Sequence, residues 1–194
     1  MSQGSTANLF GYYIMPKYKM TLEEFLGESD NQMDPIIIFK VMKSVFRALE
    51  VLHQAGYTHN DIKTNNIMLD SKYNAYLVDL GFTTRFLDSD QLHVQKPETV
   101  KMFRGNILFA SVHQMCFLST SRRDDLTAAC YLLLSLLNKN NFPVIPSSFS
   151  FEYEDAAGMK KKFAFIKELK KQYPLPRMAR HLSKCMIFNS AKTE

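Results

Sequence analysis

The chain has 194 residues, of which 46% are hydrophobic and 22% are charged, and its formal net charge is +5. A chain of this length and apolar content can bury a core of its own, which excludes a linker or a disordered tail and predicts one domain, or at most two small ones. The modest positive charge fits any protein with anionic ligands or substrates and does not by itself favour nucleic acid as a partner.

The first predicted element is a buried strand over residues 9–15, because this stretch is aromatic and β-branched and lies between polar residues. Pro16 ends the strand, since proline has no N–H to donate to a sheet. The sequence from Thr21 to Glu24 has the pattern of a capping box, in which the two side chains satisfy free amides at a helix start. It predicts a short helix that ends near Gly27.

From Pro35 the apolar residues recur at intervals of three and four, which predicts a long amphipathic helix that Gly56 ends. Two short strands are expected next, over residues 67–69 and 75–78. The turn-forming residues 70–74 between them predict that the two strands pair as a small hairpin. The apolar positions of the helix are Ile38, Val41, Met42, Val45, Leu49 and Leu52.

Residues 82–104 are polar and follow no period, which predicts a functional or mobile loop. Residues 124–137 are strongly apolar and predict a helix that is buried nearly all round. Two further helices are expected near residues 159–171 and 176–188. On the first of these we expect a buried face made by Phe163, Phe165, Ile166 and Leu169, and a solvated face made by Lys160, Lys161, Lys162, Lys167, Lys170 and Lys171.

The three cysteines, Cys116, Cys130 and Cys185, stand far apart and form no C-x-x-C pair. We expect buried thiols in a reducing compartment, and no structural zinc site. The N-terminus lacks a basic start followed by an apolar run, and the longest apolar stretch, residues 128–137, is too short to cross a bilayer. We therefore expect an intracellular protein of the cytoplasm or nucleus, with no membrane partner.

The chemically informative motif is H-x-D-x-K-x-x-N, followed by a strand, a turn, a second strand and D-x-G. Its first carboxylate could orient a substrate hydroxyl and accept its proton, and its lysine could offset charge on a phosphoryl group in transfer. The asparagine and the second aspartate supply oxygen ligands of the kind that Mg²⁺ requires, and the hairpin brings both to one mouth. The motif residues are His59, Asp61, Lys63, Asn66, Asp79 and Gly81.

Taken singly, each piece also has a structural interpretation: a surface ion pair, a turn, or a satisfied core histidine. Their occurrence together and in this order, after a long helix, favours the chemical interpretation. The order resembles the catalytic loop and metal-binding motif of protein kinases. Further along, residues 104–111 (RGNILFAS) and 121–126 (SRRDDL) resemble the casein kinase 1 family and its vaccinia-related kinase cousins. The resemblance runs from about Tyr12 to about Phe188.

This resemblance implies an α+β, protein-kinase-like fold, with ATP and Mg²⁺ as cofactors and a Ser/Thr-bearing protein as substrate. Asp61 then matches the catalytic base, Lys63 the phosphate-contacting lysine, and Asn66 and Asp79 the magnesium ligands. Asp125 matches a buried aspartate that anchors the catalytic loop, although a simple helix N-cap would also explain it. Adenine would be held by the gatekeeper Met15, by the hinge at residues 16–19, which includes Tyr18, and by an apolar floor that includes Met68 and Val78.

The resemblance also implies parts that these residues do not supply. In a kinase, roughly the first third provides a Gly-rich loop, a strand lysine and a helix glutamate. Before Met15 the chain has only Gly4 and Gly11, and no lysine precedes Lys17. We therefore expect a partial kinase domain over residues 1–194: the last N-lobe strand and hinge at 9–19, and a mostly helical C-lobe at 20–190.

Three smaller departures from the pattern affect regulation and specificity. Asn60 stands where many kinases have arginine, so a phosphorylated loop residue would lose its usual cationic partner. Leu80 replaces the phenylalanine of D-F-G and can fill the same slot. Leu108 replaces an arginine that helps hold phosphate, which does not favour pre-phosphorylated substrates. The hydroxyls left as weak candidates for an activating switch are Thr83, Thr84, Ser89 and Thr99.

Three hypotheses about function remain open. The first is a protein Ser/Thr kinase that is inactive in this partial form, and the second is a non-catalytic, pseudokinase-like binding or scaffold module. The third, a small-molecule phosphotransferase of the aminoglycoside-kinase type, is disfavoured by Lys63 and by S-R-R-D-D-L. We also expect self-association through uncovered apolar surface around residues 12–15 and 69–78.

Overall fold

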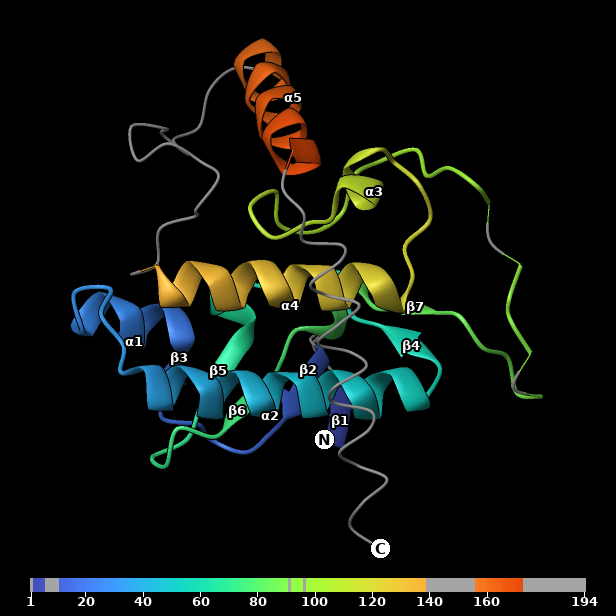
Figure 1. Ribbon diagram of the computed structural model, residues 1–194. Helices are drawn as coiled ribbons and strands as arrows, with labels where there is room; N and C mark the ends of the chain where they lie inside the picture. The colour runs from blue at the N-terminus through green and yellow to red at the C-terminus, as the bar shows by residue number, and fades with distance from the viewer. Residues whose placement is uncertain (1, 6–10, 91, 96, 139–155, 173–194) are drawn as a thin grey trace, which may run out of the picture.

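The computed structural model describes residues 2–5, 11–90, 92–95, 97–138 and 156–172. Two helices form its centre: α2 (Pro35–Gln54) and α4 (Arg122–Leu137) lie side by side and antiparallel (Figure 1). Helix α2 buries the predicted apolar stripe except Leu52, which is half-buried, and α4 is buried over most of its surface. Both predicted helices are confirmed, although α4 begins two residues earlier than expected.

Local capping explains where these helices begin. Thr21 and Glu24 form the predicted capping box at the start of α1 (Leu22–Glu28), with the Glu24 amide donating to Thr21 Oγ1 at 3.0 Å. Asp34 caps α2, and Pro35 occupies the first helical position, where its missing N–H costs nothing. Ser121 and Asp124 form a second capping box at the start of α4. The cap of α4 is therefore Ser121, and Asp125 is not the N-cap.

A small antiparallel sheet packs against α2. Its strands, in spatial order, are β3 (Met20–Thr21), β5 (Ile67–Leu69) and β6 (Ala75–Leu77). The pairing of Met68 with Tyr76 gives the predicted hairpin, and β3 joins its other edge. Ile67 and Leu69 are buried, so Met68 and its neighbour Tyr76 lie on the opposite face.

Residues 82–104 are less irregular than predicted. Strand β7 (Thr84–Arg85) pairs with β4 (Tyr57–Thr58), which directly precedes the motif. The short 3₁₀ turn η1 (Thr64–Asn66) ends at Asn66, and a second one, η2 (Leu80–Phe82), directly follows Asp79. Gly56 lies at φ +85°, a conformation that favours glycine, and its carbonyl accepts from the amides of Phe86 and Leu87. The loop is thereby fastened to the end of α2.

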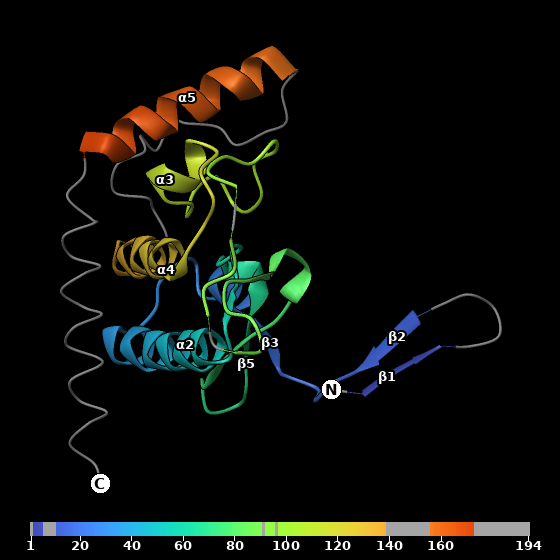
Figure 2. The ribbon, with the colours of Figure 1, turned by 90° about the vertical axis from the view of Figure 1, so that its right-hand side faces the viewer.

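The predicted N-terminal strand is present, but its last residue is exposed. Strand β2 (Gly11–Ile14) pairs with β1 (Ser2–Ser5), which was not predicted, and this hairpin projects away from the helical body (Figure 2). Ile14 is 60% exposed because the hairpin has only its own partner strand to pack against. The prediction of burial was therefore wrong for Ile14 and Met15, the two residues of the range 9–15 whose exposure the structure describes.

Two more helices lie beyond α4. Helix α3 (Val112–Met115) packs against α5 (Ala156–Gln172), the outermost helix in both views (Figures 1 and 2). The assignment of faces on α5 was wrong at two positions, since Lys170 is buried and Phe165 is exposed. The helix predicted for residues 176–188 lies outside the described residues.

The cysteines differ from one another. Cys130 is buried in α4, and burial raises the pKa of its thiol to about 12, whereas Cys116 is exposed, contrary to the prediction. Cys185 lies outside the described residues. Within the described part of the chain, no helix has both the length and the apolar character needed to cross a membrane.

Candidate active site

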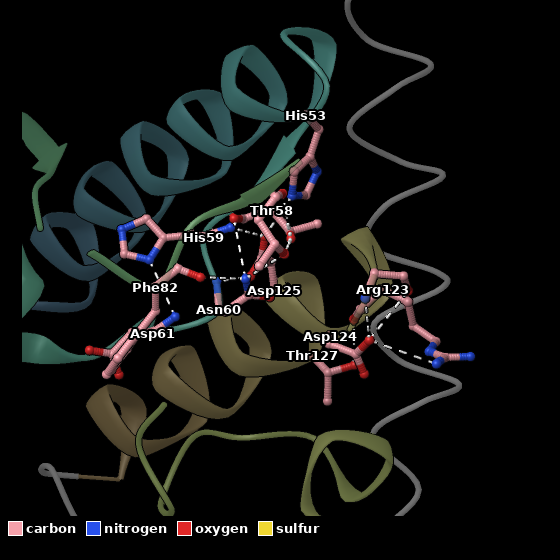
Figure 3. A network of polar contacts seen from close by, with 12 residues as sticks. His53, Thr58, His59, Asn60, Asp61, Phe82, Arg123, Asp124, Asp125 and Thr127 are labelled. Atoms are coloured by element: carbon pink, nitrogen blue, oxygen red, sulfur yellow. Dashed lines mark hydrogen bonds and ion pairs between the residues drawn. The ribbon is translucent and has the colours of Figure 1, made fainter. Parts of the chain in front are cut away.

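A buried carboxylate fixes the segment that precedes Asp61. Asp125, from α4, accepts the backbone amides of His59 at 2.8 Å and Asn60 at 2.7 Å, and lies 2.8 Å from His53 Nε2 (Figure 3). Asp125 is 1% exposed, and a charge buried so deeply is tolerated only when hydrogen bonds replace its lost water. The anchoring contact expected from the resemblance is therefore present in the structure.

Three of the predicted site residues lie together. The Asp61 carboxylate, 3% exposed, accepts from Lys63 Nζ at 2.7 Å and from Asn66 Nδ2 at 2.9 Å, both on Oδ2. Asn66 Nδ2 also donates to the Asp61 carbonyl oxygen at 2.9 Å. The lysine keeps a positive charge beside a carboxylate that is otherwise shielded from water, and the amide holds that carboxylate in one orientation.

The predicted metal ligands are joined through the backbone. The Val78 amide donates to the Asn66 carbonyl at 3.0 Å, and the Val78 carbonyl lies 3.2 Å from His59 Nε2, so Asp79 follows a residue tied to both site segments. Asp79 lies at φ +60°, an uncommon conformation for a non-glycine residue. Its exposed carboxylate accepts from the Gly81 amide through Oδ1.

The donor set fits a hard divalent cation. Both Asn66 amide hydrogens are used on Asp61, which leaves Asn66 Oδ1 as the oxygen available to a cation, and Asp79 keeps Oδ2. Among the described residues, no hydrogen bond joins Asp79 to Asp61 or Asn66, and no group of three or more His, Cys, Asp or Glu residues could hold a metal. The predicted metal ligands are therefore one amide oxygen, from Asn66, and one carboxylate, from Asp79.

The predicted adenine-contacting residues are only partly brought together. The ring of Tyr18 lies against that of Tyr76, with centroids 4.7 Å apart, on the face of the hairpin that also carries Met68. The Lys19 amide donates to the Leu69 carbonyl, so the expected hinge runs directly into the small sheet. Met15, which directly follows β2, is 41% exposed.

Two residues that sequence reasoning missed also contact the catalytic loop. Gln114, on α3, donates through Nε2 to the carbonyls of Asn60 and Arg104, at 3.1 and 2.6 Å. Gly105 lies at φ +113°, and a Cβ there would come within 2.5 Å of the Asn60 carbonyl oxygen. The resemblance included both positions in or near its second motif, but a local pattern carries no signal for a contact 45 residues or more away.

The buried contacts of Lys170 on α5 were also not predicted from the sequence. Its ammonium group donates to the carbonyls of Ile107 and Ala110, at 2.9 and 2.7 Å, and lies 4.6 Å from the centre of the Tyr131 ring. Burial lowers the pKa of this lysine well below its ordinary value. A signal was available, because Lys170 follows the buried Ile166 by four residues and so shares its face of the helix.

Comparison with known proteins identifies the class. The family model described as "Protein kinase domain" matches residues 10–186, nearly the whole chain. The chain therefore belongs to the protein kinase family.

Its relatives include kinases of the casein kinase 1 group, which agrees with the motifs. The chain is 31% identical to a probable casein kinase I homolog of Encephalitozoon cuniculi, over 82% of this chain and 47% of the relative. It is 38% identical to a casein kinase 1-like protein of rice (46% of this chain, 13% of the relative) and 26% identical to the B1 kinase of vaccinia virus (66% and 43%). The chain thus spans about half the length of these relatives, or less.

Proposed function

We propose that this chain carries the catalytic loop of a protein serine/threonine kinase, which transfers the γ-phosphoryl group of ATP to a protein hydroxyl. The observation that carries the proposal is the cluster of Asp61, Lys63 and Asn66, held to α4 by Asp125. A buried, oriented carboxylate with a cation beside it is what a phosphoryl acceptor requires, because phosphoryl transfer is catalysed mainly by positioning and charge stabilisation.

Each residue has a role that its contacts support. Asp61 orients the substrate hydroxyl and accepts its proton through the carboxylate that Lys63 and Asn66 hold in place. Lys63, half-buried and two residues away, offsets negative charge on the transferring group. Because the Lys63 ammonium contacts only Oδ2 of Asp61 in the described structure, Oδ1 is the oxygen that we assign to the hydroxyl.

Asn66 and Asp79 would hold the magnesium ion, through Asn66 Oδ1 and the Asp79 carboxylate. A magnesium ion held there would supply positive charge against the phosphate groups of ATP. Tyr18, Met68 and Val78 would line the adenine site from the hinge and the small sheet, with Met15 at its entrance. Since ATP is an intracellular substrate, the proposal implies an intracellular protein, in the cytoplasm or nucleus.

A non-catalytic binding module is the second candidate. It is favoured by apolar side chains that stand exposed beside the site: Leu80, directly after Asp79, is 47% exposed, and Tyr76 is 39% exposed. Exposed apolar groups beside an intact polar cluster suit a protein that binds a partner there. The two candidates differ in whether Asp61 is needed for the protein's activity.

The test is a phosphate-transfer assay with labelled ATP, Mg²⁺ and a Ser/Thr-rich acidic protein. Residues 1–194 contain no Gly-rich loop or strand lysine before the hinge, and losing one charge-stabilising donor costs about a hundred- to a thousandfold in rate. We therefore expect no transfer above background from the 194 residues alone. Joined to the small lobe of a related kinase, the chain should transfer phosphate.

The matched variant is Asp61→Asn, which keeps the shape and removes the base. It should abolish transfer by the joined protein, while Asp70→Asn, a carboxylate on the hairpin turn, should leave it intact. Transfer that survives Asp61→Asn, or a joined protein that folds and binds ATP without any transfer, would favour the binding module.

A further inference from the structure

Asn60, directly before Asp61, is a junction of three parts of the molecule. Its amide donates to Asp125 Oδ1 on α4, and its carbonyl accepts from Gln114 Nε2 on α3. Its side chain reaches a third part, the segment that follows Asp79 (Figure 3). Asn60 is 8% exposed, so these contacts are made away from water.

The side chain acts only as a donor. Asn60 Nδ2 donates to the Phe82 carbonyl at 2.7 Å and to Thr84 Oγ1 at 3.0 Å; we call these two bonds the amide clasp. Thr84 Oγ1 also lies 2.8 Å from Thr58 Oγ1, and Asn60 Nδ2 lies 3.4 Å from the Thr58 carbonyl. Asn60 Oδ1 has no hydrogen-bond partner among the described residues. The clasp is thus made entirely of neutral groups.

The backbone explains why asparagine suits this position. Asn60 lies at φ +69°, where glycine is comfortable, asparagine and aspartate are tolerated, and most other residues are strained. Aspartate would turn an acceptor oxygen toward the Phe82 carbonyl, and glycine would lose the clasp. Of the residues that accept this backbone, asparagine alone can make both bonds.

The segment that the clasp holds has few other supports. Leu80, Gly81 and Phe82 are all exposed, and the main backbone restraints begin only at β7 and at the amides of Phe86 and Leu87. Without the clasp, the stretch that carries Asp79 would be tied on one side through Val78 and on the other only from Thr84 onward, where β7 pairs with β4 and Thr84 contacts Thr58. The clasp therefore closes the loop on the far side of Asp79.

We propose that Asn60 is a positioning residue for Asp79: its side-chain amide holds residues 82–84 on the catalytic loop and so fixes where the Asp79 carboxylate stands. The inference rests on the proposed kinase function, in which Asp79 holds the metal ion. Because the clasp is neutral, the segment is fixed without a phosphate group. The Thr84 hydroxyl is already used in the clasp, so a phosphate on Thr84 would break the arrangement.

The first test is hydrogen exchange, which does not depend on activity. Asn60→Gly keeps the backbone conformation and its bonds to Asp125 and Gln114 but removes both bonds of the clasp, whereas Thr84→Val removes only the bond to Thr84 Oγ1. Asn60→Gly should speed exchange of the amides of Thr83, Phe86 and Leu87 by about tenfold or more, and Thr84→Val by a smaller, several-fold factor, with α4 unchanged in both. Asp30→Gly is the control for the change to glycine at positive φ, because Asp30 also has a positive φ but is exposed; it should change none of these amides.

Unchanged exchange at these three amides in Thr84→Val would overturn the proposal. Should Asn60→Gly unfold the whole chain, Thr84→Val decides the matter alone. The second test is binding of Mg²⁺–ATP to the chain joined to a small lobe. Both variants should weaken binding of Mg²⁺–ATP several-fold and leave binding of metal-free ATP the same. If a variant weakened binding of Mg²⁺–ATP and of metal-free ATP equally, a role of Asn60 at the metal would be contradicted. Faster exchange in a joined chain that never binds Mg²⁺–ATP would leave the clasp standing and refute the kinase function.

Discussion

Two glycines illustrate how much a single Cβ matters in different surroundings. At Gly105, φ is +113° and a Cβ would lie 2.5 Å from the Asn60 carbonyl oxygen and 2.7 Å from Gln114 Nε2. At Gly27, inside α1, a Cβ would meet nothing within 4 Å. The same substitution should therefore have opposite effects at the two sites.

We expect Gly105→Ala to destabilise the fold by about 2 kcal/mol or more, because both backbone strain and a clash with the catalytic loop must be relieved. Gly27→Ala should stabilise it by about 0.5–1 kcal/mol, since alanine loses less entropy in a helix. Urea unfolding followed by circular dichroism measures both. A neutral Gly105→Ala would show that the 105 segment is not pressed against the loop as described.

The residues that the sequence could predict are those of the local motif. Asp61, Lys63 and Asn66 lie within six residues of one another, so the spacing of the motif already limits how they meet. Asp125 was predicted only through the resemblance, because its bonds to His59 and Asn60 span 66 and 65 residues. The contacts of Gln114 and Gly105 with the loop could not be predicted, since nothing in a local pattern shows which distant backbone a side chain will approach.

At the scale of elements, Lys170 joins α5 to the segment before α3. Burial lowers the pKa of Lys170 below its ordinary value of 10.5. At pH values between the lowered pKa and 10.5, the unfolded chain therefore binds more protons than the folded chain. The free energy of unfolding should therefore rise with pH from the lowered folded pKa towards 10.5, the ordinary value. The buried Cys130 thiol opposes this rise only as the pH approaches its ordinary pKa of 9.0, where the unfolded chain begins to lose that proton.

The measurement is the urea midpoint of unfolding at several pH values between 7 and 9. Lys170→Met should remove most of the upward trend, and it should lower stability by about 1–3 kcal/mol because the carbonyls of Ile107 and Ala110 lose their donor. Lys171→Met is the matched control, because Lys171 is exposed and bonds only Glu168 among the described contacts. An unchanged trend in Lys170→Met would mean that this lysine stays fully charged when buried.

Elements were predicted best where local chemistry decides them. The capping box at Thr21 and Glu24 and the apolar spacing of α2 act within one or two helical turns, and both predictions were confirmed. Strand β7 was missed because two residues gain strand geometry only by pairing with β4, some 26 residues earlier. The prediction that the N-terminal strand is buried was wrong for a related reason. Its apolar residues indicate burial, but they do not show which part of the chain would cover them.

At the scale of the whole molecule, apolar surface is left open around one pocket. An open pocket of about 800 Å³ lies between α2 and the β5–β6 hairpin, and among its lining residues Val51 is 55% and Leu80 47% exposed. Leu69, which we had included in the uncovered surface, is buried at 1%. If the chain self-associates as the sequence predicts, we expect the contact to form on the outer face of the β5–β6 hairpin and on the exposed face of α2.

We expect the isolated chain to gain mass with concentration in analytical ultracentrifugation and to bind a hydrophobic dye, because exposed apolar patches favour association. Val51→Glu should reduce both effects by placing a charge at the pocket. Val94→Glu, at another exposed valine that lies in the loop and not at the pocket, should reduce neither. A monomer without dye binding across the series would refute this prediction.

The bond between Asp125 and the catalytic loop also sets an order of events during synthesis. The loop at residues 59–61 emerges from the ribosome long before Asp125, so its amides have no anchor for the time needed to add some 65 residues, which is several seconds at about 5–20 residues per second. Helices α1 and α2 and the β3–β5–β6 sheet can form first, because all their residues precede Asp125 in the chain. The site is thus completed only when α4 docks, and a nascent chain halted before Asp125 would have the motif without its geometry.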